Sequence, residues 1–142
     1  MAPSDRFKPI QKIATHKERK AAAELGESLK QRQAAEQRLA ELQDYLKEYL
    51  ERFARAARNG LSSSQVMEYQ VFISKLETAL AEQKKIVTQS QQQCDSSKQQ
   101  WRGRYTKSKA MENAVGRLQE TERKNQQHRE QLEADERAQR KR

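Results

Sequence analysis

The sequence predicts an all-α fold of two long helices that form an antiparallel coiled-coil hairpin, with the C-terminal helix the longer. Three observations predict it. Only 34% of the 142 residues are hydrophobic and 35% are charged, which leaves little apolar surface for a compact core. The composition is rich in strong helix formers, with four Gly and two Pro. Apolar residues recur at alternating steps of three and four, the period of a left-handed coiled coil.

The first helix is expected to follow a frayed N-terminus, residues 1–6, and to begin near Pro9, because a missing N–H costs little in a first turn. Its stripe has an apolar start at Phe7, Ile10 and Ile13. The stripe then continues through Ala14, Glu18, Ala21, Leu25, Ser28, Arg32, Ala35, Leu39, Leu42, Leu46, Tyr49, Phe53 and Ala56. This pattern predicts one continuous helix that ends near Arg58.

The break between the helices is expected at residues 59–62. Asn59 followed by Gly60 is typical of a helix end, where Gly adopts a left-handed conformation. Ser62 and Gln65 have the spacing of a capping box, which begins the next helix. A stop, a short turn and a capped start predict a tight helical hairpin.

The second helix carries a stripe with the same rhythm. It consists of Val66, Tyr69, Ile73, Leu76, Leu80, Gln83, Val87, Ser90, Cys94, Ser97, Trp101, Arg104, Ser108, Met111, Val115 and Leu118. The hairpin is therefore expected to cover residues 7–118. Residues from about 115 onward have no intramolecular partner in this scheme, and residues 119–142 are expected to form a polar, basic helix or tail.

Closing the hairpin at this turn pairs residues whose numbers add up to roughly 121. The pairs are Phe53 with Tyr69, Leu46 with Leu76, Leu42 with Leu80, Ala21 with Trp101, and Ile10 with Met111. Tyr49 then lies level with Phe72, and Tyr45 with Leu76. The two stripes agree in this register over most of the first helix.

Nothing in the sequence indicates catalysis. The two histidines, His16 and His128, are far apart, and no phosphate-binding loop or metal-ligand cluster is present. A two-helix hairpin also offers no deep pocket for a small-molecule substrate. We expect a protein that is not an enzyme and has no cofactor and no metal.

Charge and cysteine content indicate the setting of the protein. The net charge is +9, which suggests an acidic protein surface or nucleic acid as partner. Cys94 is the single cysteine and indicates a reducing compartment. Without an apolar run long enough for a membrane span or a signal peptide, we expect a cytoplasmic protein.

Two groups of residues are candidates for partner binding. Near the turn, Tyr45, Phe72 and Ala79 lie one position off the stripe, where coiled coils are normally polar. The register groups them into one patch with the stripe residues beside them: Leu42, Tyr45, Tyr49, Phe72, Leu76 and Ala79. Aromatic patches of this kind anchor protein interfaces, whereas the alternative is a broadened core.

The second group lies where both chain ends meet. Basic residues gather on both helices there, including Lys12, Lys17, Lys20, Arg102, Arg104 and Lys107. The register brings two runs of the same sign together, which costs stability unless an acidic partner compensates. A solvated face is the alternative interpretation.

The patch, the turn and the basic end together resemble the flagellar FliJ family of type III export proteins, which are related to YscO-type injectisome stalk proteins. The resemblance rests on residues 42–49 (LQDYLKEY), the Asn59-Gly60 turn, residues 69–79 (YQVFISKLETA), and Trp101 followed by a basic run. It covers most of residues 7–118.

The resemblance implies a component of the flagellar export apparatus that resembles the gamma subunit of rotary ATPases. It implies three partners: the export gate protein FlhA, the export ATPase FliI and the export substrate chaperones. It maps gate binding to the aromatic patch and ATPase binding to the basic end, with location at the inner face of the cell membrane only through partners. The alternatives are a basic coiled coil that binds nucleic acid and a generic structural or oligomerising rod.

Overall fold

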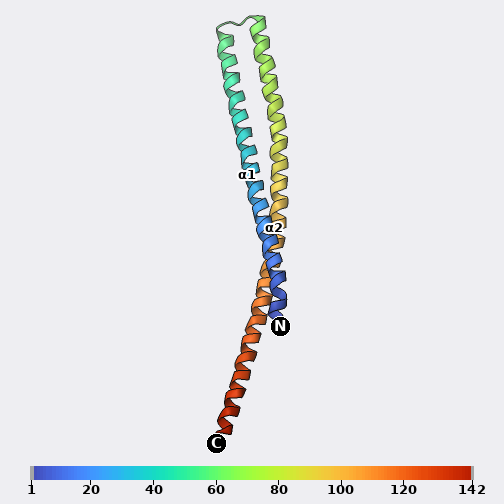
Figure 1. Cartoon of the computed structure of the whole chain (residues 1–142). Coiled ribbons are helices and arrows are strands. Elements are labelled where there is room, and N and C mark those ends of the chain that lie inside the picture. Colours follow the sequence, from blue (N-terminus) through green and yellow to red (C-terminus); the bar gives the residue numbers. More distant parts are fainter. Residues whose placement is uncertain (1, 142) are drawn as a thin grey trace. The chain divides into compact units, whose positions relative to one another are not determined.

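The computed structural model describes residues 2–141 and consists of two helices, α1 (Pro3–Arg58) and α2 (Ser63–Arg140) (Figure 1). The helices pack against each other, α2 is the longer with 78 residues against 56, and residues 2–141 contain no strand. The predicted fold class is confirmed. The chain divides into a turn unit, Glu24–Lys98, and a terminal unit, whose described part spans residues 2–23 and 99–141.

The connection at residues 59–62 has the geometry that its sequence predicts. Gly60 has a φ of 91°, the left-handed conformation that glycine adopts without strain. The Asn59 N–H donates to the carbonyl of Ala56 at 3.2 Å, which closes the last turn of α1. Ser62 N–H donates to Gln65 Oε1 at 3.0 Å, and Gln65 N–H donates to Ser62 Oγ at 3.2 Å. The capping box is confirmed.

The buried residues follow the predicted stripes. The hydrophobic ones are Ala21, Ala35, Leu42, Leu76, Leu80, Val87, Cys94 and Val115. All eight are stripe positions, and so are the buried Ser28 and Ser97. The seam between the helices is therefore the core of each unit.

The seam is polar in the part of the turn unit that lies far from the turn. The buried Ser28 and Ser97 hydroxyls hydrogen-bond to each other at 2.8 Å, beside Cys94, which is fully buried. Closer to the turn, Gln83 Nε2 donates to the carbonyl of Ala35 at 3.0 Å. Within residues 2–141 every buried side-chain nitrogen and oxygen atom has a hydrogen-bond partner. Small and satisfied polar residues let the helices stay close where large apolar ones are absent.

The expectation of a frayed N-terminus is wrong for residues 3–6, and Met1 lies outside the described residues. α1 begins at Pro3, which takes the first helical position where its missing N–H costs little, and Pro9 lies inside the helix. Ser4 is 3% exposed, and its N–H and Oγ donate to the two carboxylate oxygens of Glu122 at 2.9 and 2.7 Å. The carboxylate accepts from an N–H that the first helical turn leaves unpaired. Its negative charge also interacts favourably with the positive end of the helix dipole.

The expected end of the helix pairing also needs correction. Because Glu122 contacts Ser4, α2 has an intramolecular partner beyond residues 115 and 118. Every residue from Arg123 to Lys141 is exposed, while α2 stays helical to Arg140. None of the described helices is long and apolar enough to cross a membrane.

The expectation that the first stripe begins with apolar seam residues is wrong as well. Ile10 and Ile13 are 49% and 56% exposed, so Ile10 does not pack in the seam opposite Met111. The half-buried positions beside them are Gln11 and Ala14. These positions continue the heptad register of the stripe, and the two isoleucines lie one residue off it.

Candidate protein-interaction surfaces

An aromatic cluster joins the two helices near the turn. The ring centroids of Tyr49 and Phe72 are 4.3 Å apart, and those of Tyr45 and Phe72 are 6.1 Å apart in an edge-to-face arrangement. Tyr69 continues the cluster, 5.4 Å from Tyr49 and 5.1 Å from Phe53. The predicted levels of Tyr49 with Phe72 and of Phe53 with Tyr69 are confirmed.

Burial divides the six predicted patch residues into two layers. Tyr45 is 48% exposed, and Tyr49, Phe72 and Ala79 are half-buried. Leu42 and Leu76 are 8% and 7% exposed and therefore belong to the seam. We call the accessible layer, Tyr45, Tyr49, Phe72 and Ala79, the aromatic patch. Its outer ring, Tyr45, is held by an edge contact with Phe72 and remains open to a partner.

Ile86 is an extension of this surface that sequence reasoning missed. It is 46% exposed and follows Phe72 and Ala79 at steps of seven residues, so the three lie on one side of α2. The spacing was present in the sequence. Because Ile86 lies next to the stripe residue Val87, its apolar character does not stand out from the seam in the sequence.

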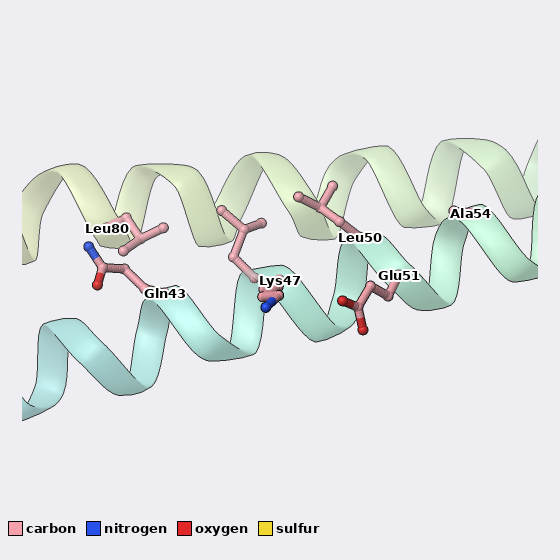
Figure 2. A pocket seen from close by; sticks show the side chains of 7 residues that line it. Gln43, Lys47, Leu50, Glu51, Ala54 and Leu80 are labelled. Carbon is pink, nitrogen blue, oxygen red and sulfur yellow. The ribbon is translucent and has the colours of Figure 1, made fainter.

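The sequence analysis also missed a shallow apolar groove on the other side of the turn unit. It has a volume of about 420 Å³. Figure 2 shows the side chains that line it. Its lining residues are Gln43, Leu46, Lys47, Leu50, Glu51, Ala54 and Leu80. Leu50 is 43% exposed and lies about 140° around α1 from Tyr45, at 100° per residue. The groove is therefore separate from the aromatic patch.

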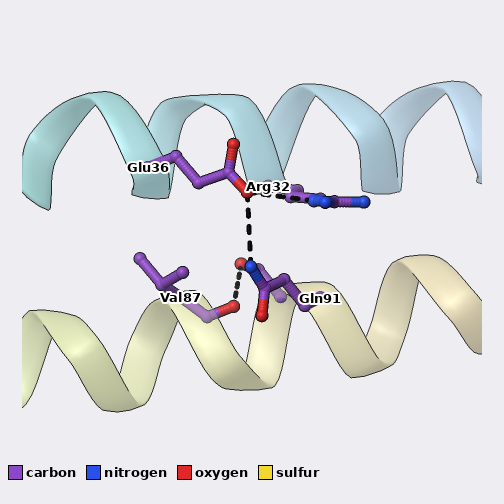
Figure 3. Close-up of polar contacts among 5 residues, drawn as sticks. Arg32, Glu36, Val87 and Gln91 are labelled. Atoms are coloured by element: carbon purple, nitrogen blue, oxygen red, sulfur yellow. Dashed lines mark hydrogen bonds and ion pairs between the residues drawn. The ribbon is translucent and has the colours of Figure 1, made fainter.

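A polar cluster bridges the helices further from the turn (Figure 3). Arg32 Nε donates to Glu36 Oε1 at 3.0 Å, and Gln91 Nε2 reaches the same oxygen at 3.4 Å. The hydrogen bond from Arg32, with a smaller contribution from Gln91, lowers the pKa of Glu36. The same hydrogen bond from Arg32 to Glu36 raises the pKa of Arg32. This cluster is solvated and links the two helices through the Gln91–Glu36 hydrogen bond.

The six predicted basic residues of the terminal unit are exposed. In the part of the chain that the structure describes, none of them makes an ion pair within 4 Å. They do not form one cluster. Lys12 and Lys17 lie about 140° apart around α1, and Arg102 and Lys107 are separated by the same angle around α2.

One aromatic ladder accompanies these charges on α2. Trp101 and Tyr105 have ring centroids 5.3 Å apart, and the Lys109 ammonium lies 5.7 Å from the Tyr105 ring centroid. Trp101 Nε1 donates to Glu18 Oε1 at 3.0 Å, which ties the half-buried indole to α1. Lys109 is also paired with Glu112 at 3.1 Å. The ladder is thus satisfied within the chain.

Residues 2–141 contain no group of three or more His, Cys, Asp or Glu side chains placed to hold a metal ion. The surfaces that remain open are suited to protein or polyanion contacts. Their chemistry is aromatic at the turn unit and cationic at the terminal unit.

Comparison with known proteins identifies the family of the chain. The profile of the family described as Flagellar FliJ protein matches residues 3–141. A protein of Salmonella typhi named Flagellar FliJ protein is 32% identical over 102 residues, which cover 72% of this chain and 69% of that protein. Since the family profile matches nearly the whole chain and the match to the relative covers more than two thirds of that protein, the chain belongs to the flagellar FliJ protein family.

Proposed function

We propose that this chain is a component of the flagellar type III protein export apparatus and couples the export ATPase FliI to the export gate protein FlhA. Family membership supports the flagellar setting. In the same proposal the chain escorts export substrate chaperones, and it is held at the inner face of the cell membrane through its partners.

The observation that carries the proposal is the aromatic patch. Tyr45 is 48% exposed in a helix pair whose other outer positions are mostly polar, and its ring rests against Phe72 from the other helix. Aromatic side chains that are pre-positioned on two rigid elements lose little conformational entropy on binding. We assign gate binding to this patch, with Ala79 as its small flanking residue.

Leu42 and Leu76 contribute to gate binding by supporting the patch from the seam. Because both are buried, replacing either tests the stability of the hairpin along with the interface. The informative variant is therefore Tyr45→Ala with Phe72→Ala. A matched control is Met67→Ala with Val71→Ala, which removes apolar side chains that are 64% and 53% exposed outside the patch.

Affinity capture from extract of flagellated cells tests the proposal. The tagged wild-type chain and the control variant are expected to recover the gate protein and the export ATPase, identified by mass spectrometry. The patch variant is expected to lose the gate protein and retain the ATPase. Recovery of neither protein by the wild-type chain, or equal recovery of the gate by patch and control variants with normal circular dichroism, would refute the proposal.

We assign ATPase binding to the basic residues of the terminal unit. Lys12, Lys17, Lys20, Arg102, Arg104 and Lys107 are exposed and have no ion-pair partner in the described chain. Exposed cations without partners favour an acidic surface, and their contribution falls as salt is raised. Replacement of the six by Gln is expected to lose the ATPase while the gate is retained.

A further inference from the structure

One side of the terminal unit combines exposed isoleucines with cations and lacks acidic residues. At 100° per residue, five residues of α1 fall within an arc of about 80°. They are Arg6, Ile10, Ile13, Lys17 and Lys20, and all five are exposed. Ile10 and Ile13 are 49% and 56% exposed. Two bulky aliphatic side chains are thus held in water among three cations.

The acidic residues of this part of α1 lie elsewhere. Residues 3–23 contain only Asp5 and Glu18 as acids. Asp5 pairs with Lys8 at 3.3 Å and lies about 100° from the centre of the arc. Glu18 accepts the hydrogen bond from Trp101 in the seam. No carboxylate of residues 3–23 lies on the arc, and Glu24, four residues after Lys20 on the same side of α1, marks its end.

α2 extends this side with small and basic residues. Lys107 and Ala114 occupy the heptad position that contacts the flank of α1 carrying Ile10, and Gly103 and Ala110 lie next to them on the outside. Glu112 lies across the seam, since it lines a hollow with Gln11 on the opposite flank. We call the combined surface the acid-free face, comprising Arg6, Ile10, Ile13, Lys17, Lys20, Gly103, Lys107, Ala110 and Ala114.

We infer that the acid-free face binds anionic lipid membranes directly, in addition to the attachment through protein partners. Exposed aliphatic side chains among Lys and Arg are the composition of helices that lie in the membrane interface. Their apolar groups enter the boundary between headgroups and acyl chains, while the cations attract anionic headgroups. Gly103, Ala110 and Ala114 allow a flat surface to approach α2 closely.

Shape favours a membrane over a protein helix as the occupant. Hollows of the terminal unit lie off this face: one is lined by Lys8, Lys12 and Arg19 among others, and one by Gln11 and Glu112 among others. Ile10 and Ile13 line neither of these two hollows. A helical partner needs a groove, whereas a bilayer accepts projecting side chains.

Vesicle flotation with the full purified chain tests this inference. The probes are vesicles of phosphatidylcholine alone and vesicles with about one third phosphatidylglycerol, a composition chosen to give a surface potential. The chain is expected to float with the anionic vesicles and not with the neutral ones. Binding is expected to fall as salt is raised, because the headgroup attraction is screened.

Three double variants test which residues of the acid-free face contribute to vesicle binding. Ile10→Gln with Ile13→Gln keeps every charge and is expected to weaken binding at least about tenfold, through lost apolar burial. Lys17→Gln with Lys107→Gln is expected to weaken it about 30-fold, the effect of two charges at the surface. The control, Lys12→Gln with Arg19→Gln, removes the same charge outside the face and is expected to stay within about threefold of wild type. Circular dichroism checks that all three remain helical.

Two outcomes would overturn the inference. The first is absence of flotation with anionic vesicles. The second is an equal loss of vesicle binding in Lys17→Gln with Lys107→Gln and in the control, together with unchanged binding of the isoleucine variant. That result would indicate unspecific charge attraction. If the face variants instead abolish capture of an acidic protein while vesicles do not bind, the surface is a protein interface and the inference fails. Gate capture through the aromatic patch is expected to be unchanged in all three variants, so failure here is separate from failure of the proposed function.

Discussion

The contact between Ser4 and Glu122 yields a prediction that can be worked out from the structure. Glu122→Ala removes the acceptor of two hydrogen bonds, at 2.9 and 2.7 Å, from a serine that is 3% exposed. A buried donor left without a partner costs about 1–3 kcal/mol, and loss of an anion at a helix N-terminus adds about 0.3–1 kcal/mol. A local destabilisation of about 2 kcal/mol corresponds to about 30-fold more frequent opening.

Amide hydrogen exchange measures this opening directly. In Glu122→Ala, protection of the first turns of α1 is expected to fall by about 30-fold, while amides of the turn unit keep their rates. The matched control is Glu120→Ala, which removes a carboxylate paired with Arg123 on α2 and leaves Ser4 untouched. Unchanged protection of α1 in Glu122→Ala, or an equal loss in the control, would refute the argument.

Three further predictions concern the turn unit. Gly60→Ala is expected to lower the free energy of unfolding by about 1 kcal/mol in urea denaturation, because Gly60 has a φ of 91°. Leu76→Ala, at a site that is 7% exposed, is expected to lower it by about 2–3 kcal/mol in the same assay. The hydrogen bond from Arg32 lowers the pKa of Glu36 below the ordinary 4.5. The stability that the ionised Glu36 adds to the folded state is therefore present above pH 4.5 and is lost as pH falls through the folded-state pKa. Arg32→Gln is expected to raise the pKa of Glu36 toward 4.5 in an NMR titration; no change would contradict the assignment.

The turn and the seam could be predicted because their signals are local and strong. Asn59-Gly60 and the Ser62–Gln65 spacing each specify a backbone geometry that few other residues adopt. A heptad repeat fixes which side chains face a partner helix, so the buried residues of both units follow from it. The contact of Tyr49 with Phe72 follows from the register that the turn sets.

The N-terminal region could not be predicted in the same way. Two prolines, Pro3 and Pro9, both fit a first helical turn, and the choice depends on Glu122, which lies 118 residues away from Ser4 in sequence. Ile10 and Ile13 read as seam residues because they are apolar. Counting back from Ala14 in strict heptads places Gln11 in the seam instead, so the register was a better guide than hydrophobicity.

The sequence predicted which residues gather near the aromatic patch, but not how exposed each of them is. Sequence spacing grouped Tyr45 with Phe72, yet the same spacing could not show that Leu42 and Leu76 are covered while Tyr45 is 48% exposed. That difference depends on how far the rings lean over the seam, which is decided by packing between the two helices.

Binding of the purified cytoplasmic region of the gate protein, measured by isothermal titration calorimetry, tests the central claim most directly. Tyr45→Ala with Phe72→Ala is expected to weaken the gate complex at least about 100-fold, since two aromatic anchors contribute about 2 kcal/mol or more each. Met67→Ala with Val71→Ala is expected to bind as the wild-type chain does. Equal affinity of the patch variant and the wild-type chain would contradict the claim that the aromatic patch holds the export gate.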